Sequence, residues 1–114
     1  MTATAFQVVL VWVAFAEDHT KGKTRPAIVL QKEGELLQLI WATSQHVSQS
    51  CAQPWEFCVT DEREMKVMGH TKPARYSFRR GGVIVVKAQD IKRVTGYAPK
   101  SVLTRLVHAA RNSI

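Results

Sequence analysis

The sequence predicts a mainly β protein of the α+β class, folded as a small closed or half-closed barrel with a C-terminal helix. Apolar, β-branched and aromatic residues recur in short runs, enough for roughly five to seven strands, and turn-forming residues separate these runs. Only the C-terminal segment keeps helical spacing over several turns. With 114 residues, of which 46% are apolar, the chain can form one core. We therefore expect residues 1–114 to form a single domain.

A strand and a hairpin are expected in the first part of the chain. Residues 6–15 are dense in Val, Trp and Phe, which is typical of a largely buried strand. The polar residues 17–25 fit neither period and predict a loop. Residues 26–31 and 35–42 are apolar again and flank a turn at 32–34, so together they predict a β-hairpin.

The middle of the chain is less regular. Residues 43–54 are polar and without apolar periodicity, and we expect a loop there. Residues 55–60 alternate well enough for a further strand. The sequence DERE at residues 61–64 resembles a capping box, and Gly69 is placed to end a short helix.

The last part of the chain predicts two strands and the terminal helix. Residues 73–78 and 82–88 flank the turn-forming sequence RRGG, and we expect two strands around that turn. Pro99 is favoured as a first helical residue. The apolar residues after it recur with helical spacing, which predicts one amphipathic helix.

Charge is distributed unequally between the two halves of the chain. The net charge is +7, but residues 1–60 hold four Lys/Arg against five Asp/Glu, whereas residues 61–114 hold twelve against four. A basic half of this kind suits a polyanionic partner, because binding to phosphates releases condensed counterions. The alternative is a basic surface without a specific partner.

Membrane insertion and secretion are not expected. The longest apolar run, residues 8–16, has 9 residues, and about 20 are needed to cross a bilayer. The N-terminus lacks the charged start and cleavage pattern of a secretory signal. We therefore expect a cytoplasmic protein.

No metal site or cofactor site is expected. Cys51 and Cys58 stand seven positions apart, and neither His46 nor His70 completes a zinc-ligand spacing with them. We interpret both cysteines as ordinary thiols. A disulfide is the alternative, although two cysteines are too few for a disulfide-dependent scaffold.

Four motifs carry a resemblance to a known family. In order, they are VWVAF at residues 11–15, TRPAIVL at residues 24–30, ATSQ at residues 42–45 and KPAR at residues 72–75. Their order and spacing resemble the PemK/MazF family of bacterial toxin endoribonucleases, over residues 6 to about 78. The resemblance implies an SH3-like barrel and a homodimer.

The same resemblance implies a function. Members of the family are toxins of toxin-antitoxin systems. They cleave single-stranded RNA sequence-selectively without metal, through a 2′,3′-cyclic phosphate, and a cognate antitoxin occludes the RNA groove. We expect these properties here. They imply no cofactor.

The resemblance also implies catalytic residues. Arg25 matches the catalytic arginine of the family, and Thr43 matches its active-site threonine. Arg75 lies where some relatives carry an arginine that is followed two residues later by an aspartate base, but here that second residue is Ser77. From the residues alone, Arg25 precedes a proline and is therefore extended, so its fork of donors can reach a phosphate. A turn-capping hydroxyl is the alternative for Thr43.

The motifs assign no residue as the general base. Glu17, Asp18 and His19 lie in one predicted loop and are candidates, and His19 is attractive because an unperturbed histidine titrates near neutrality. A solvated loop side chain is the alternative for His19. The missing aspartate favours a second function, a catalytically inactive barrel that binds nucleic acid or inhibits a host protein.

Further polar and basic residues near the motifs are predicted to bind RNA. They are Lys21, Lys23, Ser44, Gln45, Lys72, Arg79 and Arg80. The tryptophans Trp12, Trp41 and Trp55 can stack on bases, but tryptophans in strands more often fill a core, and we expect that role for them.

Overall fold

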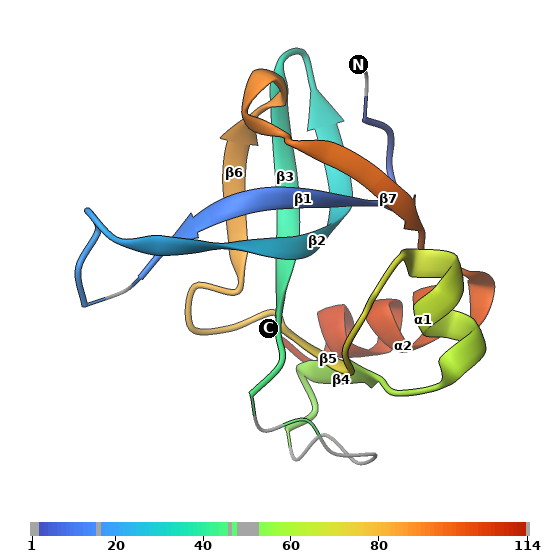
Figure 1. Cartoon of the computed structure of the whole chain (residues 1–114). Helices are drawn as coiled ribbons and strands as arrows, with labels where there is room; N and C mark the ends of the chain where they lie inside the picture. Colours follow the sequence, from blue (N-terminus) through green and yellow to red (C-terminus); the bar gives the residue numbers. More distant parts are fainter. Residues whose placement is uncertain (1–2, 16, 46, 48–52, 114) are drawn as a thin grey trace.

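A computed structural model describes residues 3–15, 17–45, 47 and 53–113. The described residues form seven strands and two α-helices, with a short 3₁₀ turn at Ala88–Asp90 (Figure 1). In chain order the elements are β1 (Gln7–Ala14), β2 (Gly22–Glu33), β3 (Leu36–Thr43), β4 (Glu56–Val59), α1 (Glu62–Met68), β5 (Ala74–Ser77), β6 (Val83–Lys87), β7 (Arg93–Tyr97) and α2 (Lys100–Arg111).

The strands form one antiparallel sheet that curls into a half-barrel. The strand order is β4-β5-β3-β2-β1-β7, and β6 also pairs with β3. One edge of β3 therefore serves two partners, with β6 alongside residues 36–40 and β5 alongside residues 42–43. Register shifts between β2 and β3 and between β1 and β7 add twist, which helps the sheet to curl.

Two apolar clusters cover opposite faces of the central strands. Val8 and Ile28 belong to the cluster beneath the helices, whereas Val9, Ala27 and Val29 belong to the cluster inside the half-barrel. Successive strand residues point to opposite faces, so a strand that is buried on both faces must be apolar throughout. This explains the unbroken apolar run of β1, of which only Trp12 is largely exposed.

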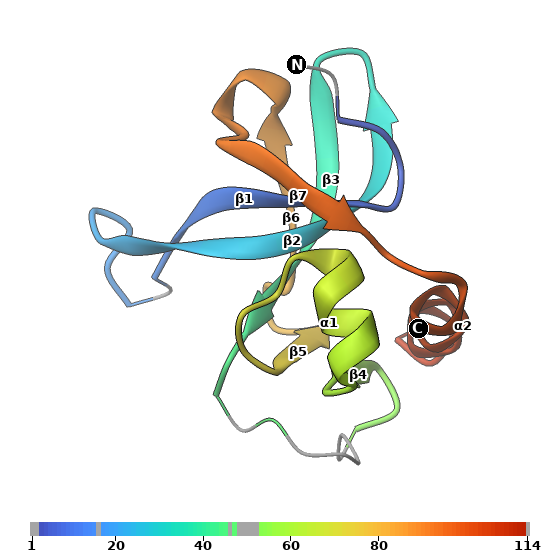
Figure 2. The same ribbon diagram turned by 45° about the vertical axis from the view of Figure 1, so that its right-hand side comes forward.

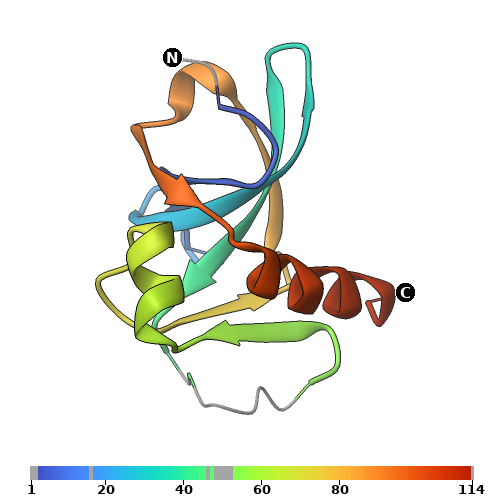
Figure 3. The same cartoon turned by 90° about the vertical axis from the view of Figure 1, so that its right-hand side faces the viewer.

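The helices lie at one end of the molecule together with β4 and β5 (Figures 2 and 3). Asp61 caps α1 by accepting hydrogen bonds from the backbone N–H of Arg63 and Glu64, and Gly69 ends this helix with φ of 75°. Helix α2 begins after Pro99 and buries Val102, Leu106 and Ala109 against the first cluster. Among the described residues, no helix is long and apolar enough to cross a membrane.

The predicted fold class is confirmed, with two local corrections. The loop expected at 17–25 is shorter, because β2 begins at Gly22 and pairs with Ala14 of β1. The strands expected around the RRGG turn exist as β5 and β6, but they do not pair with each other, since both lie along β3.

The expectation of ordinary thiols is wrong for Cys58. This residue, on β4, is disulfide-bonded, and the described part of the chain contains no free cysteine. Cys51 lies outside the described residues.

Candidate functional site

Three neighbouring cavities share side chains at the place where β3 ends. We name them the Arg75 cavity (about 320 Å³), the Arg25 cavity (about 310 Å³) and the Trp12 cavity (about 780 Å³) after one residue of each. Thr43 lines the first two, Arg25 lines the last two, and Trp41 and Arg80 line both the Arg75 and Trp12 cavities. The three cavities therefore form one continuous candidate site.

The floor of the Arg75 cavity is the polar face of β4 and β5. In β5, Ala74 and Tyr76 are buried in the core, so Arg75 and Ser77 face the opposite way into the cavity. Thr43 of β3 is the register partner of Arg75. The alternation of a short strand thus places a cation beside the hydroxyl at the end of β3.

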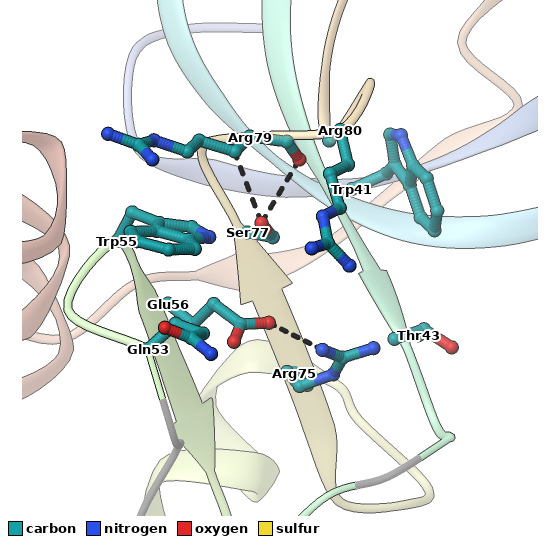
Figure 4. Close-up of a pocket in the computed structure, with 10 residues that line it drawn as sticks. Trp41, Thr43, Gln53, Trp55, Glu56, Arg75, Ser77, Arg79 and Arg80 are labelled. Atoms are coloured by element: carbon teal, nitrogen blue, oxygen red, sulfur yellow. Dashed lines mark hydrogen bonds and ion pairs between the residues drawn. The ribbon is translucent and has the colours of Figure 1, made fainter. Parts of the chain in front are cut away.

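Arg75 forms an ion pair with Glu56 of β4 (Figure 4). The Glu56 side chain is 7% exposed and that of Arg75 is 28% exposed. Arg75 therefore lies between Glu56 on one neighbouring strand and Thr43 on the other, with only part of its donor fork engaged by the carboxylate.

The turn after β5 forms the rim of this cavity. The Ser77 hydroxyl donates to the carbonyl of Arg79 and accepts from its N–H, at 3.0 and 3.2 Å. The Arg79 guanidinium lies 4.1 Å from the ring centroid of Trp55, and Arg80 has an unusual positive φ of 59°. The backbone of this turn thus directs both arginines around the cavity.

Arg25 reaches the site from β2. It pairs with Val11 and precedes Pro26, so its backbone is extended as predicted. Its Cζ atom lies 4.9 Å from the ring centroid of Trp41 on β3. The Trp41 indole N–H donates to the carbonyl of Gly81 at 2.7 Å, which holds the ring in place beneath Arg25.

Thr43 makes the turn-capping contact that the sequence offers as the alternative to an active-site role. Its Oγ1 accepts a hydrogen bond from the N–H of Gln45 at 3.1 Å. The same hydroxyl faces two of the cavities, and its own proton remains available for donation.

The site is strongly cationic. Seven Lys/Arg side chains line it, and among the described lining residues the carboxylates are those of Glu17 and Glu56. The cations are Lys23, Arg25, Lys72, Arg75, Arg79, Arg80 and Arg93. A concave surface with this excess of positive charge attracts a polyanion and concentrates it.

Most residues predicted for the site from the sequence do line it. Ten of the eleven occur around the three cavities, namely His19, Lys23, Arg25, Thr43, Ser44, Gln45, Lys72, Arg75, Arg79 and Arg80. Lys21 is the exception among the cavities described: its backbone closes the loop between β1 and β2, and its side chain is exposed. His19 lies in the Trp12 cavity, away from the cavity of Arg75.

Sequence reasoning missed Glu56, Arg93 and the cavity-facing positions of Trp41 and Trp55. Glu56 begins β4 and Trp55 directly precedes it, and the pairing of this short strand with β5 has no local signal in the sequence. Arg93 comes from β7, a strand for which we predicted no boundaries. The expectation of core tryptophans is wrong for Trp12, which is 45% exposed.

His70 borders the Arg25 cavity, but its ring is engaged in a hydrogen bond with another side chain of the protein. One of its ring nitrogens (Nε2) lies 2.7 Å from the hydroxyl of Tyr76. Burial lowers the pKa of His70 to about 4, because the charged ring would lose its hydration, and burial raises the pKa of Tyr76 for the same reason. Both groups are therefore neutral at pH 7.

The described residues contain no cluster of three or more His, Cys, Asp or Glu side chains that is suited to a metal ion. The site presents hydroxyls, guanidinium and ammonium groups, indoles and the carboxylates of Glu17 and Glu56. The hydroxyls, cations and indoles can bind phosphates, stabilise negative charge and stack on planar rings.

The fold is similar to that of solved toxin structures. It matches the Mycobacterium tuberculosis toxin MazF-mt6 with a TM-score of 0.64 and 17% sequence identity, over 92% of this chain and 94% of that chain. It also matches a chain of the MazE-MazF (Form-II) crystal structure from Deinococcus radiodurans, with a TM-score of 0.62 and 18% identity, over 93% of this chain and 89% of that one. No protein-family model and no curated protein sequence matches the chain. The resemblance seen in the sequence is confirmed at the level of structure: this chain has the fold of the MazF toxins.

Proposed function

We propose that the chain is an endoribonuclease toxin that cleaves single-stranded RNA without a metal ion. One observation carries the proposal. Arg25, Thr43 and Arg75 come from three different strands and line cavities that share walls. These are the residues that the PemK/MazF resemblance singled out, although they are far apart in the sequence.

The proposed reaction is attack of the ribose 2′-oxygen on the adjacent phosphorus. It requires removal of the 2′-hydroxyl proton, positive charge near the phosphorane and protonation of the departing 5′-oxygen. Arg25 and Arg75 supply the positive charge, and the Thr43 hydroxyl can donate to a phosphate oxygen. The products are a 2′,3′-cyclic phosphate and a 5′-hydroxyl end.

Single strands are the substrate that the site favours. Trp41 and Trp55 both border the Arg75 cavity and each stacks with an arginine. Unpaired bases can stack on such indole and guanidinium planes, whereas bases inside a duplex cannot reach them. The cavity volume of about 320 Å³ is suited to a small part of the strand, such as one nucleotide.

An antitoxin and a second copy of the chain are the proposed partners. The matched Deinococcus structure is one of MazE with MazF, and a cationic site of this kind suits an acidic antitoxin segment. We propose action in the cytoplasm, on cellular RNA, as a homodimer. The long apolar run of residues 6–15 would suit a dimer interface, but the fold buries most of β1, so this run is no argument for dimerisation. Sedimentation at micromolar concentration tests the dimer, and a monomer throughout would contradict it.

An RNA cleavage assay tests the activity. Purified protein is incubated with single-stranded RNA of mixed sequence in EDTA. We expect cleavage, and the downstream fragments should accept phosphate directly from a polynucleotide kinase because they begin with a 5′-hydroxyl. Arg25→Ala should abolish most of this activity, whereas Arg63→Ala, which alters an exposed arginine outside the described cavities, should not.

The second candidate is a catalytically inactive module that binds nucleic acid or inhibits a host protein. Ser77 favours it, because its hydroxyl is engaged with the turn at Arg79 and supplies no carboxylate to the cavity. If the wild type binds RNA but leaves it intact and does not arrest growth on expression, this candidate replaces the first.

A further inference from the structure

We propose that Glu56 is the general base that removes the 2′-hydroxyl proton, an inference that rests on the proposed RNA cleavage. The sequence motifs assign no role to this residue.

The pairing of β4 with β5 places the Glu56 carboxylate in the Arg75 cavity. Glu56 is the direct register partner of Ser77, so the two side chains project from the same face of the sheet. Phe57, the next residue of β4, is 3% exposed and packs in the core on the other face. Figure 4 shows the carboxylate extending toward Arg75 beneath Ser77.

The ion pair fixes the position of this carboxylate. The guanidinium of Arg75 binds one carboxylate oxygen, Oε2. The second oxygen, Oε1, makes no hydrogen bond or ion pair with the described residues, and the Glu56 side chain lines the cavity. A base that is held by one oxygen and free at the other is oriented for proton transfer, and the group that orients it is also the one that can stabilise the phosphorane.

The other candidate bases are less well placed. Glu17 and His19 are exposed loop residues of the Trp12 cavity, and neither makes a hydrogen bond or ion pair with the described residues. Asp18 is engaged by Thr20, whose hydroxyl and N–H both donate to one carboxylate oxygen. His70 lies in the Arg25 cavity and is engaged by Tyr76. Of these groups, only Glu56 is partly buried and fixed beside a cation that faces the substrate.

The step balances as an internal transesterification. A carboxylate oxygen of Glu56 takes the 2′-hydroxyl proton, and the 2′-oxygen forms a bond to phosphorus. The bond between phosphorus and the 5′-oxygen breaks, and the departing oxygen keeps the electron pair and takes a proton from water. Glu56 then returns its proton to solvent. Neither an oxidant nor a metal ion takes part.

Charged groups surround Glu56 on both sides of the sheet edge. Arg75, Arg79 and Arg80 share its cavity. A second hollow, between β4 and α2, brings further titratable groups near it, namely Asp61, Glu64, Arg105 and His108. A pH profile of cleavage therefore has to be compared between variants instead of being assigned to one residue from the wild type alone.

The test measures single-turnover cleavage of RNA in EDTA by the wild type and Glu56→Gln. Glutamine keeps the size of the side chain and an oxygen that can accept from Arg75, but it cannot take a proton. We expect kcat to fall by about 100-fold or more, the scale for loss of a general base, while KM changes little.

Glu64→Gln is the matched control. Glu64 also pairs with an arginine, Arg105, and is also largely buried, at 13% exposure, but it does not border the Arg75 cavity. This variant loses a comparable ion pair, so it should keep kcat within a few-fold of the wild type. An equal loss in both variants would mean that ion-pair disruption, and not proton transfer, lowers the rate, and would overturn the proposal.

The pH profile of cleavage distinguishes a general base at Glu56 from a residue with only a structural role. The wild type should lose activity toward low pH as its base becomes protonated, and Glu56→Gln should lack this decline. The double variant Glu56→Gln/Ser77→Asp should regain part of kcat, because residue 77 presents its side chain to the same cavity. A double variant no faster than Glu56→Gln would contradict the placement of the base on this wall.

The outcomes separate this inference from the proposed function. A wild type that leaves RNA intact overturns both. A wild type that cleaves RNA, together with a Glu56→Gln variant that cleaves equally fast or fails only through a raised KM, overturns the role of Glu56 alone.

Discussion

The guanidinium of Arg25 lies over the indole of Trp41, with Cζ 4.9 Å from the ring centroid. The contact joins β2 to β3 across a half-exposed surface, and the indole is itself tied to the turn at Gly81. Under the proposed function, a cation stacked in this way loses little further freedom when it binds an RNA phosphate.

Replacing Arg25 tests its importance for catalysis. Arg25→Ala should lower RNA cleavage by roughly two or three orders of magnitude, the scale for loss of one transition-state donor, with little change in the thermal midpoint. Arg25→Lys should restore little, because an ammonium group does not reproduce the planar fork. Thr43→Ala should cost less, since water can partly replace a hydroxyl. Equal cleavage by wild type and Arg25→Ala would show that the residue assignment is wrong.

Salt dependence tests the cationic surface. We expect affinity for single-stranded RNA to fall steeply between low and physiological salt, because phosphate contacts release counterions. Reversing charge at Arg79 and Arg80 should weaken binding and flatten this dependence. The double variant Arg63→Glu/Arg111→Glu makes the same change in net charge at exposed positions outside the three cavities. Identical effects of both double variants would argue against a localised RNA surface.

His70 should make the protein less stable in mild acid. Its pKa is lowered from 6.5 to about 4 in the folded state, so as the pH falls through 6.5 the unfolded chain binds a proton that the folded chain does not. Stability is thus complete above pH 6.5, falls between 6.5 and about 4, and loses up to about 3 kcal/mol from this group. Denaturant unfolding at several pH values measures the decline.

Two variants identify the residue responsible for that decline. His70→Gln should flatten the dependence between pH 6.5 and 4, and His19→Gln, which changes an exposed side chain, is the matched control. An unchanged decline in His70→Gln would assign the acid sensitivity to other groups.

Gly82 is expected to tolerate no side chain. A Cβ atom at this position would lie 1.9 Å from the carbonyl oxygen of Ser77, so the end of β5 or the turn would have to move. Gly82→Ala should destabilise the protein by roughly 1–3 kcal/mol, as overpacking does. Gly81→Ala tests a different penalty, since a Cβ atom there meets open space but its φ is 76°. Thermal unfolding of both variants distinguishes the two effects, and a fully stable Gly82→Ala would contradict the close approach.

The sequence predicted the strands whose side chains alternate or are apolar throughout, because these patterns are local. It also placed Thr43 correctly at the end of a strand, where a polar loop follows. Arg25 was expected at the start of a strand, but it lies inside β2, which begins at Gly22. The pairing of β5 and β6 was not predictable in the same way. The RRGG turn suits a hairpin, and only the long edge of β3 determines that both strands bind there instead of to each other.

Glu56 shows why part of the site could not be predicted. Nothing near Glu56 in the sequence indicates that it faces Arg75, nineteen positions away. The contact depends on the register of β4 against β5, and a shift of one residue would turn the carboxylate toward the core. Sequence reasoning therefore located the arginines and left their carboxylate partner unassigned.

The branching of the sheet at β3, where β5 and β6 pair with the same edge, has a consequence for the proposed choice of substrate. The Arg75 cavity lies next to the place on β3 where pairing with β6 ends and pairing with β5 begins. The distance between its walls therefore depends on the position of β5. On the core side, Tyr76 holds β5 in position, because its ring is stacked on that of Phe57 of β4 with the ring centroids 4.9 Å apart. Under the proposed function, residues that do not contact RNA can thus influence which nucleotide fits the cavity. A search for altered cleavage preference should begin beneath the cavity floor, before any residue on its walls is changed.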